Sequence, residues 1–249
     1  MEARELEGRV SLVTGASRGI GRAVAVRLAA LGSSVAVNYH SSREAAEALA
    51  REIEERGGEV MLAGADVRQE PQVKAMVDGV VARWGHLDIL VNNAGIVRNE
   101  MLLRLSTQDW EAVIDTCLKG AYLCCKYALR HMLETGWGRI INTSSVAALR
   151  GNYGQTNYSA AKGGLISLTR SLAREVGSHG ITVNAIAPGL INTDMMQTVP
   201  EGYQKEVMSR LAIKRVGEPE DVAELVAFLA SERAGYITAQ VIAVDGGLI

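Results

Sequence analysis

Short apolar runs, rich in β-branched residues, alternate with longer amphipathic stretches along this chain. The apolar residues within a run are consecutive and are not interleaved with polar ones, as expected for strands that are buried on both faces of a sheet. Seven such runs predict strands, at residues 10–14, 34–39, 59–67, 88–95, 139–145, 182–189 and 240–247.

The stretches between these runs have the apolar spacing of helices. The spacing predicts helices that end at residue 31 and near residue 84, that cover residues 43–56, 109–135 and 218–231, and that follow residue 156. Strands that alternate with helices predict βαβ units. They therefore predict a parallel sheet covered by helices on both faces. No Pro-, Gly- or Ser-rich linker interrupts the alternation, so we expect a single α/β domain over residues 1–249.

Residues 192–213 break this alternation between a predicted strand and the last predicted helix. The segment carries Met195, Met196 and Met208. Flexible methionine side chains suit a mobile lid over a binding site. An ordinary helical excursion on the surface fits the same pattern, so the sequence leaves both interpretations open.

Composition narrows the classes of function. Hydrophobic residues make up 48% of the 249 residues and charged residues 22%, as in ordinary soluble domains. The net charge of -2 and the lack of a basic stripe argue against nucleic-acid binding. The first residues, MEARELEGR, argue against a secretory signal, and no 18 apolar residues run together. We therefore expect no membrane anchor and a cytoplasmic location. Cys117, Cys124 and Cys125 form no CxxC pair, so we expect reduced core thiols and no metal site.

A glycine-rich turn, TGASRGIGRA, directly follows the first predicted strand and opens the first predicted helix. Gly15, Gly19 and Gly21 are spaced GxxxGxG within it. Glycines allow a tight turn and a close approach of the backbone to a pyrophosphate, which the amino end of a helix attracts. In this position the turn predicts a dinucleotide site; a merely tight strand-to-helix turn is the alternative.

The second predicted strand indicates which dinucleotide is bound. Sites for NAD usually present a carboxylate to the ribose 2′-hydroxyl at the end of this strand. Here the strand ends in VNYHSSR, and neither Asn38 nor Tyr39 is acidic. A 2′-phosphate can therefore be accommodated, with Arg18 as its expected partner, whereas Arg43 is better explained as a solvated residue of the first helical turn. The pattern favours NADPH.

Tyr158 and Lys162 stand four residues apart in TNYSAAK, on one face of a predicted helix. A cation near a phenol favours the phenolate and lowers the tyrosine pKa, which allows a tyrosine to act as a general acid or base. An isolated YxxxK is a short pattern. A tyrosine that caps the core, with a lysine that reaches to water, would explain it as well.

TGASRGIG, NNAG and YxxxK occur in this order, and with them essentially the whole chain resembles the short-chain dehydrogenase/reductase family. The resemblance implies a doubly wound, Rossmann-type domain with a mostly parallel seven-stranded sheet. Residues 1 to about 140 would form the cofactor half, and the residues from there to 249 the catalytic and substrate half. The cofactor-binding residues that the resemblance implies are Gly15, Ser17, Arg18, Gly19, Ile20, Gly21, Asn38, Asp66, Val67, Asn93, Ala94, Gly95, Tyr158, Lys162, Pro188, Gly189, Ile191 and Thr193.

The same resemblance assigns the chemistry to Ser145, Tyr158 and Lys162. Ser145 lies 13 residues before Tyr158, at the spacing of the family's serine, and Ser144 is then structural. Lys162 would bind the nicotinamide ribose and lower the pKa of Tyr158. Tyr158 would donate a proton to a carbonyl oxygen that Ser145 holds, while hydride reaches the carbon from the cofactor.

One position departs from the family. Its members usually carry an asparagine in the long helix, in a pattern like TNLxG, where this chain has Cys117 in TCLKG. The resemblance assigns to that asparagine a local distortion of the helix and a water that connects the lysine to solvent. A thiol is a poor hydrogen-bonding group, so we expect slower proton resupply with activity retained. A neutral packing substitution is the alternative.

The resemblance also bears on the substrate. The segment IKRVGEPEDVAELVAFLAS followed by ITAQVIAVDGG resembles most the family members that reduce 3-oxoacyl groups on acyl carrier protein in fatty acid biosynthesis, and these are the expected class. GWGRIIN and GQTNYSAAK resemble equally those that reduce acetoacetyl-CoA in polyester synthesis. The resemblance therefore implies NADPH-dependent reduction of a 3-oxoacyl thioester, by a homotetramer whose faces are the helices that contain Cys124 and Leu168.

Two other classes of function stay open. A dehydrogenase of a steroid, sugar or polyketide would use the same scaffold with a different pocket. A non-catalytic dinucleotide-sensing subunit is a third class, for which the cysteine at residue 117 is the one hint, and intact Ser145, Tyr158 and Lys162 argue against it.

The residues expected to bind an acidic carrier are missing. In the carrier-dependent reductases, arginines near the start of the fifth strand and the end of the tyrosine helix hold the carrier at the mouth of the active site. The matching positions are Gly136 and His179, although Arg130 and Arg174 lie within one or two helical turns. We therefore expect the carrier-bound substrate to have only a modest advantage over the free CoA thioester.

Overall fold

The computed structural model describes residues 4–197 and 201–249. Seven strands form one sheet in the order β3-β2-β1-β4-β5-β6-β7, and all neighbouring strands are parallel. The prediction of a single α/β domain with a parallel seven-stranded sheet is confirmed. The strands are β1 (Val10–Val13), β2 (Ser34–Tyr39), β3 (Val60–Gly64), β4 (Ile89–Asn92), β5 (Gly138–Thr143), β6 (Ile181–Pro188) and β7 (Val241–Val244).

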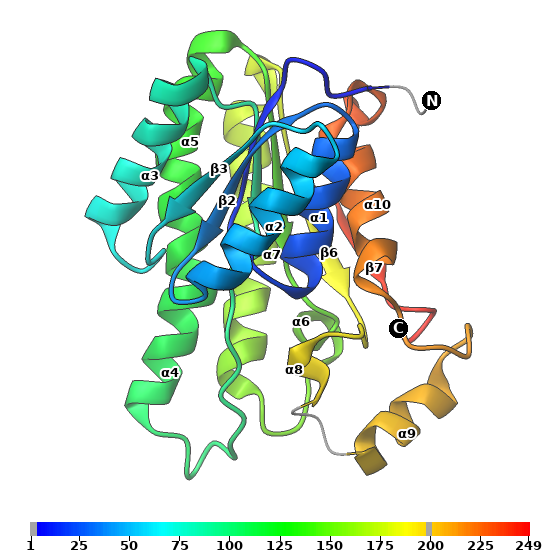
Figure 1. Cartoon of the computed structure of the whole chain (residues 1–249). Helices are drawn as coiled ribbons and strands as arrows, with labels where there is room; N and C mark the ends of the chain where they lie inside the picture. Colours follow the sequence, from blue (N-terminus) through cyan, green and yellow to red (C-terminus); the bar gives the residue numbers. More distant parts are fainter. Residues whose placement is uncertain (1–3, 198–200) are drawn as a thin grey trace.

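Helices cover both faces of this sheet (Figure 1). Leu12 and Val13 are consecutive in β1, and they lie in the two different apolar cores that the sheet separates. Burial on both faces is the reason why the strands read as consecutive apolar residues. One layer contains α1 (Gly19–Ala30), α2 (Arg43–Glu55) and α10 (Pro219–Ala230), and the other contains α3 (Glu70–Trp84), α5 (Gly120–Thr135) and α7 (Thr156–Val176).

Shorter helices lie beyond the carboxyl ends of the strands, in the lower part of Figure 1. They are α4 (Thr107–Ile114), α6 (Ala147–Arg150), α8 (Asp194–Gln197) and α9 (Glu201–Arg210). The described part of residues 192–213 is thus largely helical, whereas residues 198–200 lie outside the described residues. Met195 and Met196 line the main cleft, but Met208 does not. The segment therefore borders the site, as a lid would, and is also a helical excursion.

The long helix predicted at residues 109–135 is interrupted. A π-helical turn, η1 (Asp115–Lys119), joins α4 to α5, and the N–H of Gly120 donates to the carbonyl of Asp115, five residues earlier. Cys117 lies at the centre of this turn. Single π turns within α-helices often mark functional sites. The helix distortion that the family resemblance assigned to an asparagine is therefore present with cysteine in that place.

Candidate active site

The strands β1 to β6 open at their carboxyl ends into a cleft of ≈ 1270 Å³. The sheet order changes direction between β1 and β4, which is where open α/β sheets bind ligands. All predicted catalytic and cofactor residues line this cleft except Gly21. A side chain on Gly21 would collide with the carbonyl oxygen of Gly15 and the amide of Asn93, so Gly21 allows helix α1 to lie close to the turn.

The glycine-rich turn has the geometry of a phosphate cradle. Gly15 and Gly19 adopt φ angles of 61° and 54°, which favour glycine. A Cβ on Gly15 would lie 2.9 Å from the Cα of Ala94. Arg18 is the N-cap residue of α1, and its side chain does not cap the helix. The amino end of α1 is therefore available to an anion, and the turn fits the pyrophosphate of a dinucleotide.

Hydrogen bonds hold the NNAG segment against this turn. The hydroxyl oxygen of Thr14 accepts from the backbone N–H groups of Asn93 and Ala94, at 2.9 and 3.0 Å. In return, Asn93 Nδ2 donates to the carbonyls of Thr14 and Gly15, at 3.0 and 3.1 Å. Two segments that are far apart in the sequence thus form one rigid wall of the cleft.

Asn38 lines the cleft, but the protein itself engages its amide. Its Nδ2 donates to the carbonyls of Ala63 and Ala65, at 2.9 and 3.1 Å, and its Oδ1 accepts from the N–H of Gly15 at 3.2 Å. The side chain is buried. Asn38 therefore positions the glycine-rich turn on β2 and β3, a role that the sequence did not indicate.

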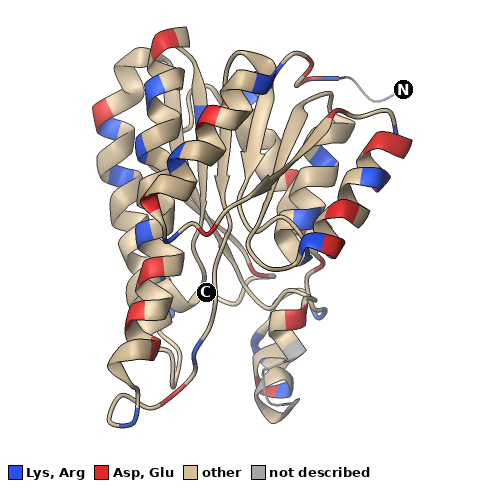
Figure 2. Ribbon diagram, turned by 60° about the vertical axis from the view of Figure 1, so that its left-hand side comes forward, with Lys and Arg blue, Asp and Glu red and all other residues tan. Residues whose placement is uncertain are grey.

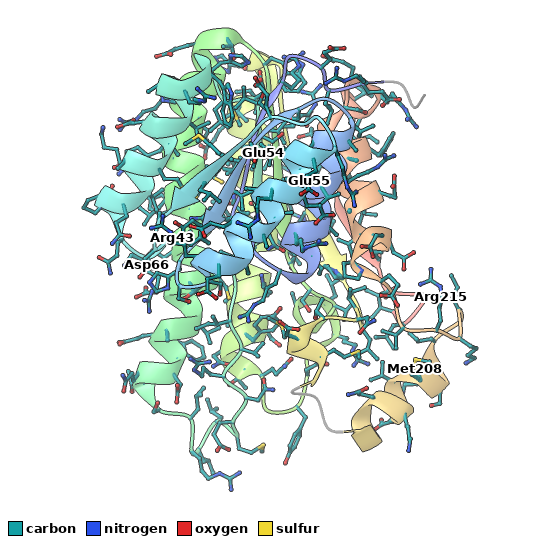
Figure 3. The ribbon with its side chains drawn as sticks, viewed as in Figure 1. Arg43, Glu54, Glu55, Asp66, Met208 and Arg215 are labelled. Carbon is teal, nitrogen blue, oxygen red and sulfur yellow. The ribbon has the colours of Figure 1, made fainter. Side chains whose placement is uncertain are left out.

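The two arginines considered for a 2′-phosphate differ in position. Arg18 is 71% exposed, lines the cleft and forms an ion pair with Asp194 of α8, with 3.6 Å between Nη1 and Oδ2. Arg43, labelled in Figure 3, pairs with Glu47 one helical turn along α2 and does not line the cleft. Arg18 is therefore the arginine placed to meet a dinucleotide, and Arg43 is the solvated residue that the sequence favoured.

Asp66 follows β3 and lies in the cleft as a carboxylate (Figure 3). The guanidinium of Arg68 donates to both of its oxygens, at 2.7 to 3.0 Å. This hydrogen bonding holds the pKa of Asp66 below its usual value. His40 is nearby, with 3.8 Å between its Nε2 and Asp66 Oδ2.

Ser145, Tyr158 and Lys162 meet at the floor of the cleft. Ser145 follows β5, and the other two project from adjacent turns of α7. Lys162 is 2% exposed, and its Nζ donates to the carbonyl of Thr143 at 2.6 Å. Its Nζ lies 5.6 Å from the centre of the Tyr158 ring. The hydroxyl of Ser144 donates to the carbonyl of Lys162 at 2.9 Å, so Ser144 has the structural role that the sequence suggested.

Burial controls the pKa values of this pair. It raises the pKa of Tyr158 well above its usual value, and the hydrogen bond with Ser145 opposes this effect only partly. Burial also lowers the pKa of Lys162. With its pKa raised, Tyr158 is in the acid form at neutral pH. Tyr158 is half-buried at the cleft, and the ammonium of Lys162 is held on the Thr143 carbonyl. The expectation that Lys162 lowers the pKa of Tyr158 stays a prediction.

Cys117 lies directly behind Tyr158 and Lys162. Its side chain is buried, packs with Val113 and Ala161 against Tyr158, and donates from Sγ to the carbonyl of Ile96 at 3.5 Å. A Cβ on the neighbouring Gly95 would lie 3.4 Å from Cys117 Sγ and 3.5 Å from Lys162 Nζ. The thiol and the ammonium thus face the same side of Gly95.

The positions expected to bind a carrier protein lie far from this cleft. Gly136 precedes β5 and His179 precedes β6, whereas the cleft is at the opposite, carboxyl ends of these strands. A strand of six residues spans about 20 Å. Arg130 and Arg174 do not line the cleft either. The expectation that these four positions surround the mouth of the chain's own active site is therefore wrong.

Sequence reasoning missed Asn157, which holds the start of the catalytic helix. Its Nδ2 donates to the carbonyl of Arg98 at 3.0 Å, and its Oδ1 accepts from the N–H of Tyr158 at 2.7 Å. The side chain is fully buried. A buried amide directly before Tyr158 is a signal that the sequence contained, but its partner lies 59 residues away in the chain.

Basic and acidic residues are mixed along the outer helices (Figure 2). The three cysteines are free and buried, and burial raises the pKa of Cys125 to about 12. Within residues 4–197 and 201–249, no helix is long and apolar enough to cross a membrane, and no cluster of histidine, cysteine and carboxylate side chains is suited to a metal ion.

Comparisons with known proteins agree with this geometry. The model of a protein family described as "Enoyl-(Acyl carrier protein) reductase" matches residues 15–249. The chain is 49% identical to the 3-oxoacyl-[acyl-carrier-protein] reductase FabG of Staphylococcus aureus over 238 residues, which cover 96% of this chain and 97% of that relative. It is 47% identical to the FabG of Staphylococcus epidermidis, over 96% of this chain and 98% of the relative. It is 46% identical to the 3-oxoacyl-[acyl-carrier-protein] reductase of Synechocystis, over 98% of both chains.

Proposed function

The chain belongs to the short-chain dehydrogenase/reductase family, and on this premise we propose that it reduces 3-oxoacyl thioesters to 3-hydroxyacyl thioesters with NADPH, in fatty acid biosynthesis. The observation that carries the proposal is the meeting of Ser145, Tyr158 and Lys162 at the floor of a cleft whose wall is a phosphate-binding turn. The names of relatives that are 46 to 49% identical over nearly the whole chain support the substrate class.

The three residues have separate roles in this reaction. Tyr158 donates its proton to the ketone oxygen, which becomes the hydroxyl of the product. Ser145, which lines the same cleft, donates to the same oxygen and fixes its position. Lys162, held on the Thr143 carbonyl, binds the nicotinamide ribose and faces the phenol. The nicotinamide supplies the hydride that reaches the carbonyl carbon.

The remaining cofactor contacts come from the wall of the cleft. We assign the pyrophosphate to the glycine-rich turn and the 2′-phosphate to Arg18, because no carboxylate of β2 opposes it. Most of these residues belong to the half up to about residue 140, and the catalytic group to the half that follows. The residues assigned to NADPH are Gly15, Ser17, Arg18, Gly19, Ile20, Asp66, Val67, Asn93, Ala94, Gly95, Tyr158, Lys162, Pro188, Gly189, Ile191 and Thr193, with Gly21 and Asn38 as positioning residues.

The test is a panel of substrates with NADPH. We expect rapid reduction of acetoacetyl-CoA and of the same acyl group on acyl carrier protein, with little reduction of a steroid ketone. An enoyl thioester belongs in the panel because of the matching family's description. The proposed roles of Tyr158 and Ser145 suit a ketone oxygen, so we expect the enoyl thioester to be reduced slowly. Rapid reduction of the enoyl thioester with inert 3-oxoacyl thioesters would overturn the assignment.

We further propose that the enzyme is a cytoplasmic homotetramer. The expected faces are α5 and α7, the helices that contain Cys124 and Leu168. Tyr122 and Leu133 of α5 are exposed apolar residues on this surface, although Cys124 itself is buried within the subunit. Analytical ultracentrifugation of the parent protein and of Tyr122→Asp would test the arrangement. A tetramer that persists unchanged in this variant would exclude the face at Tyr122.

A further inference from the structure

A second cavity, of ≈ 320 Å³, adjoins the catalytic cleft. Both are hollows beyond the carboxyl ends of the strands, and they share four residues of their walls, Arg150, Asn152, Tyr153 and Val207. The complete lining of the second cavity is Arg150, Gly151, Asn152, Tyr153, Glu206, Val207 and Arg210. The two hollows are therefore neighbours that share part of their walls.

Two guanidinium groups from different elements line the second cavity. Arg150 ends α6, and Arg210 ends α9. Figure 3 shows α9 and the following loop, with Met208 and Arg215 labelled, on the side of the molecule away from Arg43 and Asp66. Arg210 donates to Glu206 of its own helix at 2.6 Å. Arg150 and Arg210 bring two guanidinium groups to one cavity, and planar guanidinium groups suit the oxygens of a phosphate.

The Arg150 side of the cavity is tied to the catalytic helix. Arg150 Nη2 donates to Asn152 Oδ1 at 3.1 Å, and Asn152 Nδ2 donates to Gln155 Oε1 at 2.9 Å. Gln155 is the N-cap residue of α7, the helix that carries Tyr158, and its own amide donates to Asn99 at 3.0 Å. This series of hydrogen bonds holds Arg150 at a set position relative to Tyr158.

We propose that this cavity binds the phosphate of the pantetheine arm that carries the acyl group. The inference rests on the proposed function, because only a pantetheine thioester brings such an arm to Tyr158. With the ketone at Tyr158, the arm must leave the cleft, and the phosphate at its far end is its charged group. This phosphate is common to acyl-CoA and to acyl carrier protein, so the cavity serves either carrier. Arg150 and Arg210 hold it by charge-assisted hydrogen bonds.

The experiment compares three thioesters of one acyl group. Acetoacetyl-CoA and acetoacetyl-acyl carrier protein contain the phosphate, whereas the acetoacetyl thioester of N-acetylcysteamine lacks it. We expect Arg210→Gln and Arg150→Gln each to raise KM for the two phosphate-containing substrates about tenfold, since a hydrogen bond between charged groups is worth roughly that factor or more. In Arg210→Gln, the kcat/KM for the N-acetylcysteamine thioester should change less than about twofold.

Arg51→Gln is the matched control. It removes the same charge from α2, but Arg51 is exposed and lines neither cavity. It should leave all three substrates unaffected. Arg210 is the safer of the two test positions, because Arg210→Gln breaks only an ion pair within one exposed helix. A direct measurement avoids turnover: 4′-phosphopantetheine should inhibit the parent enzyme more strongly than pantetheine, and the difference should shrink in Arg210→Gln.

The outcomes separate this inference from the proposed function. If the parent enzyme reduces none of the three thioesters, both the proposed function and the phosphate site are wrong. A parent enzyme that reduces all three, with variants that lose activity equally on all of them or on none, removes only the phosphate site. If KM rises only for acetoacetyl-CoA, the second cavity binds a phosphate of free CoA. The proposal that it also binds the phosphate of acyl carrier protein would then be wrong.

Discussion

Lys162, at the floor of the cleft, is 2% exposed and bound to the carbonyl of Thr143, whereas Leu103 and Tyr153, at the rim, are 100% and 85% exposed. The floor is assembled from strand ends and the start of α7, and hydrogen bonds among buried groups hold it. The rim consists of loops and short helices, including residues 98–105 and α9. Reacting groups need fixed geometry, which a buried network provides. Substrate choice can change at the rim with little effect on folding.

Removal of the phenol oxygen tests the floor most severely. Tyr158→Phe should lower kcat by about 100 to 10,000-fold, because the general acid is lost. The Kd for NADPH should stay nearly unchanged, since Lys162 and the glycine-rich turn are intact. Single-turnover kinetics and NADPH fluorescence measure the two quantities. Near-normal turnover in this variant would remove Tyr158 from the mechanism.

Substitution of Arg18, on the proposed cofactor side of the cleft, should have a smaller effect. Arg18→Ala should reduce the preference for NADPH over NADH by roughly 10 to 150-fold, because one charge-assisted bond to the 2′-phosphate is lost. Asp194→Asn should do the opposite and modestly strengthen NADPH binding, since Asp194 competes with the phosphate for Arg18. The measurement is the ratio of kcat/KM for the two cofactors.

Arg43→Ala is the matched control for this prediction. Arg43 is also an exposed arginine near the end of β2, but it lies outside the cleft. Its removal should leave the cofactor ratio unchanged. Equal use of NADPH and NADH by the parent enzyme would contradict the assignment of Arg18.

The pH dependence of the rates tests whether burial or Lys162 has the larger effect on the pKa of Tyr158. Burial raises the pKa of Tyr158, so its acid form persists above the usual value of about 10. Reduction needs this acid form and should not decline between pH 7 and 9. Oxidation of the 3-hydroxyacyl product needs the phenolate and should rise up to about tenfold per pH unit over the same interval. A decline of the reduction rate with an apparent pKa near 7 to 8 would show that a bound cofactor lets Lys162 outweigh burial.

Substitution of Cys117, which lies behind the floor of the cleft, should have only a weak effect on kcat. Cys117→Asn should leave the fold intact and raise kcat a few-fold, or shift its pH profile, if proton resupply through this position is slow in the parent enzyme. The π-helical turn is present with cysteine, so the backbone needs no rearrangement to accept the asparagine. An unchanged kcat with an unchanged pH profile would favour the packing interpretation, in which Cys117 only fills space beside Val113 and Ala161.

The rim should be the most tolerant region. Leu103→Ser should change the free energy of unfolding by less than about 0.5 kcal/mol, because the side chain is exposed. Leu165→Ala, on the buried face of α7, should cost about 2 to 5 kcal/mol. Denaturant unfolding of both variants gives the comparison. A large loss of stability in Leu103→Ser would mean that the rim is a structural element.

Much of the fold and of the floor could be predicted from local sequence. The glycine-rich turn, NNAG and the Tyr158–Lys162 spacing each belong to one short segment, and each was placed on the cleft as expected, apart from Gly21. The prediction of one long helix at residues 109–135 was less accurate. An α-helical and a π-helical path have nearly the same apolar spacing over a few residues, so the turn at Asp115–Lys119 left no clear signal.

The sequence by itself determined the βα alternation, the parallel sheet and the candidate catalytic side chains, because each depends on contacts within one element or on residue chemistry. The tertiary structure decided how those groups are used. Asn38 is engaged by Ala63, Ala65 and Gly15, and the Tyr158 pKa is raised by burial. The tertiary structure also brought Arg150 and Arg210 to the lining of one cavity. Each of these facts depends on groups that are far apart in the chain or on the exclusion of water by the folded protein, and neither can be read from local spacing.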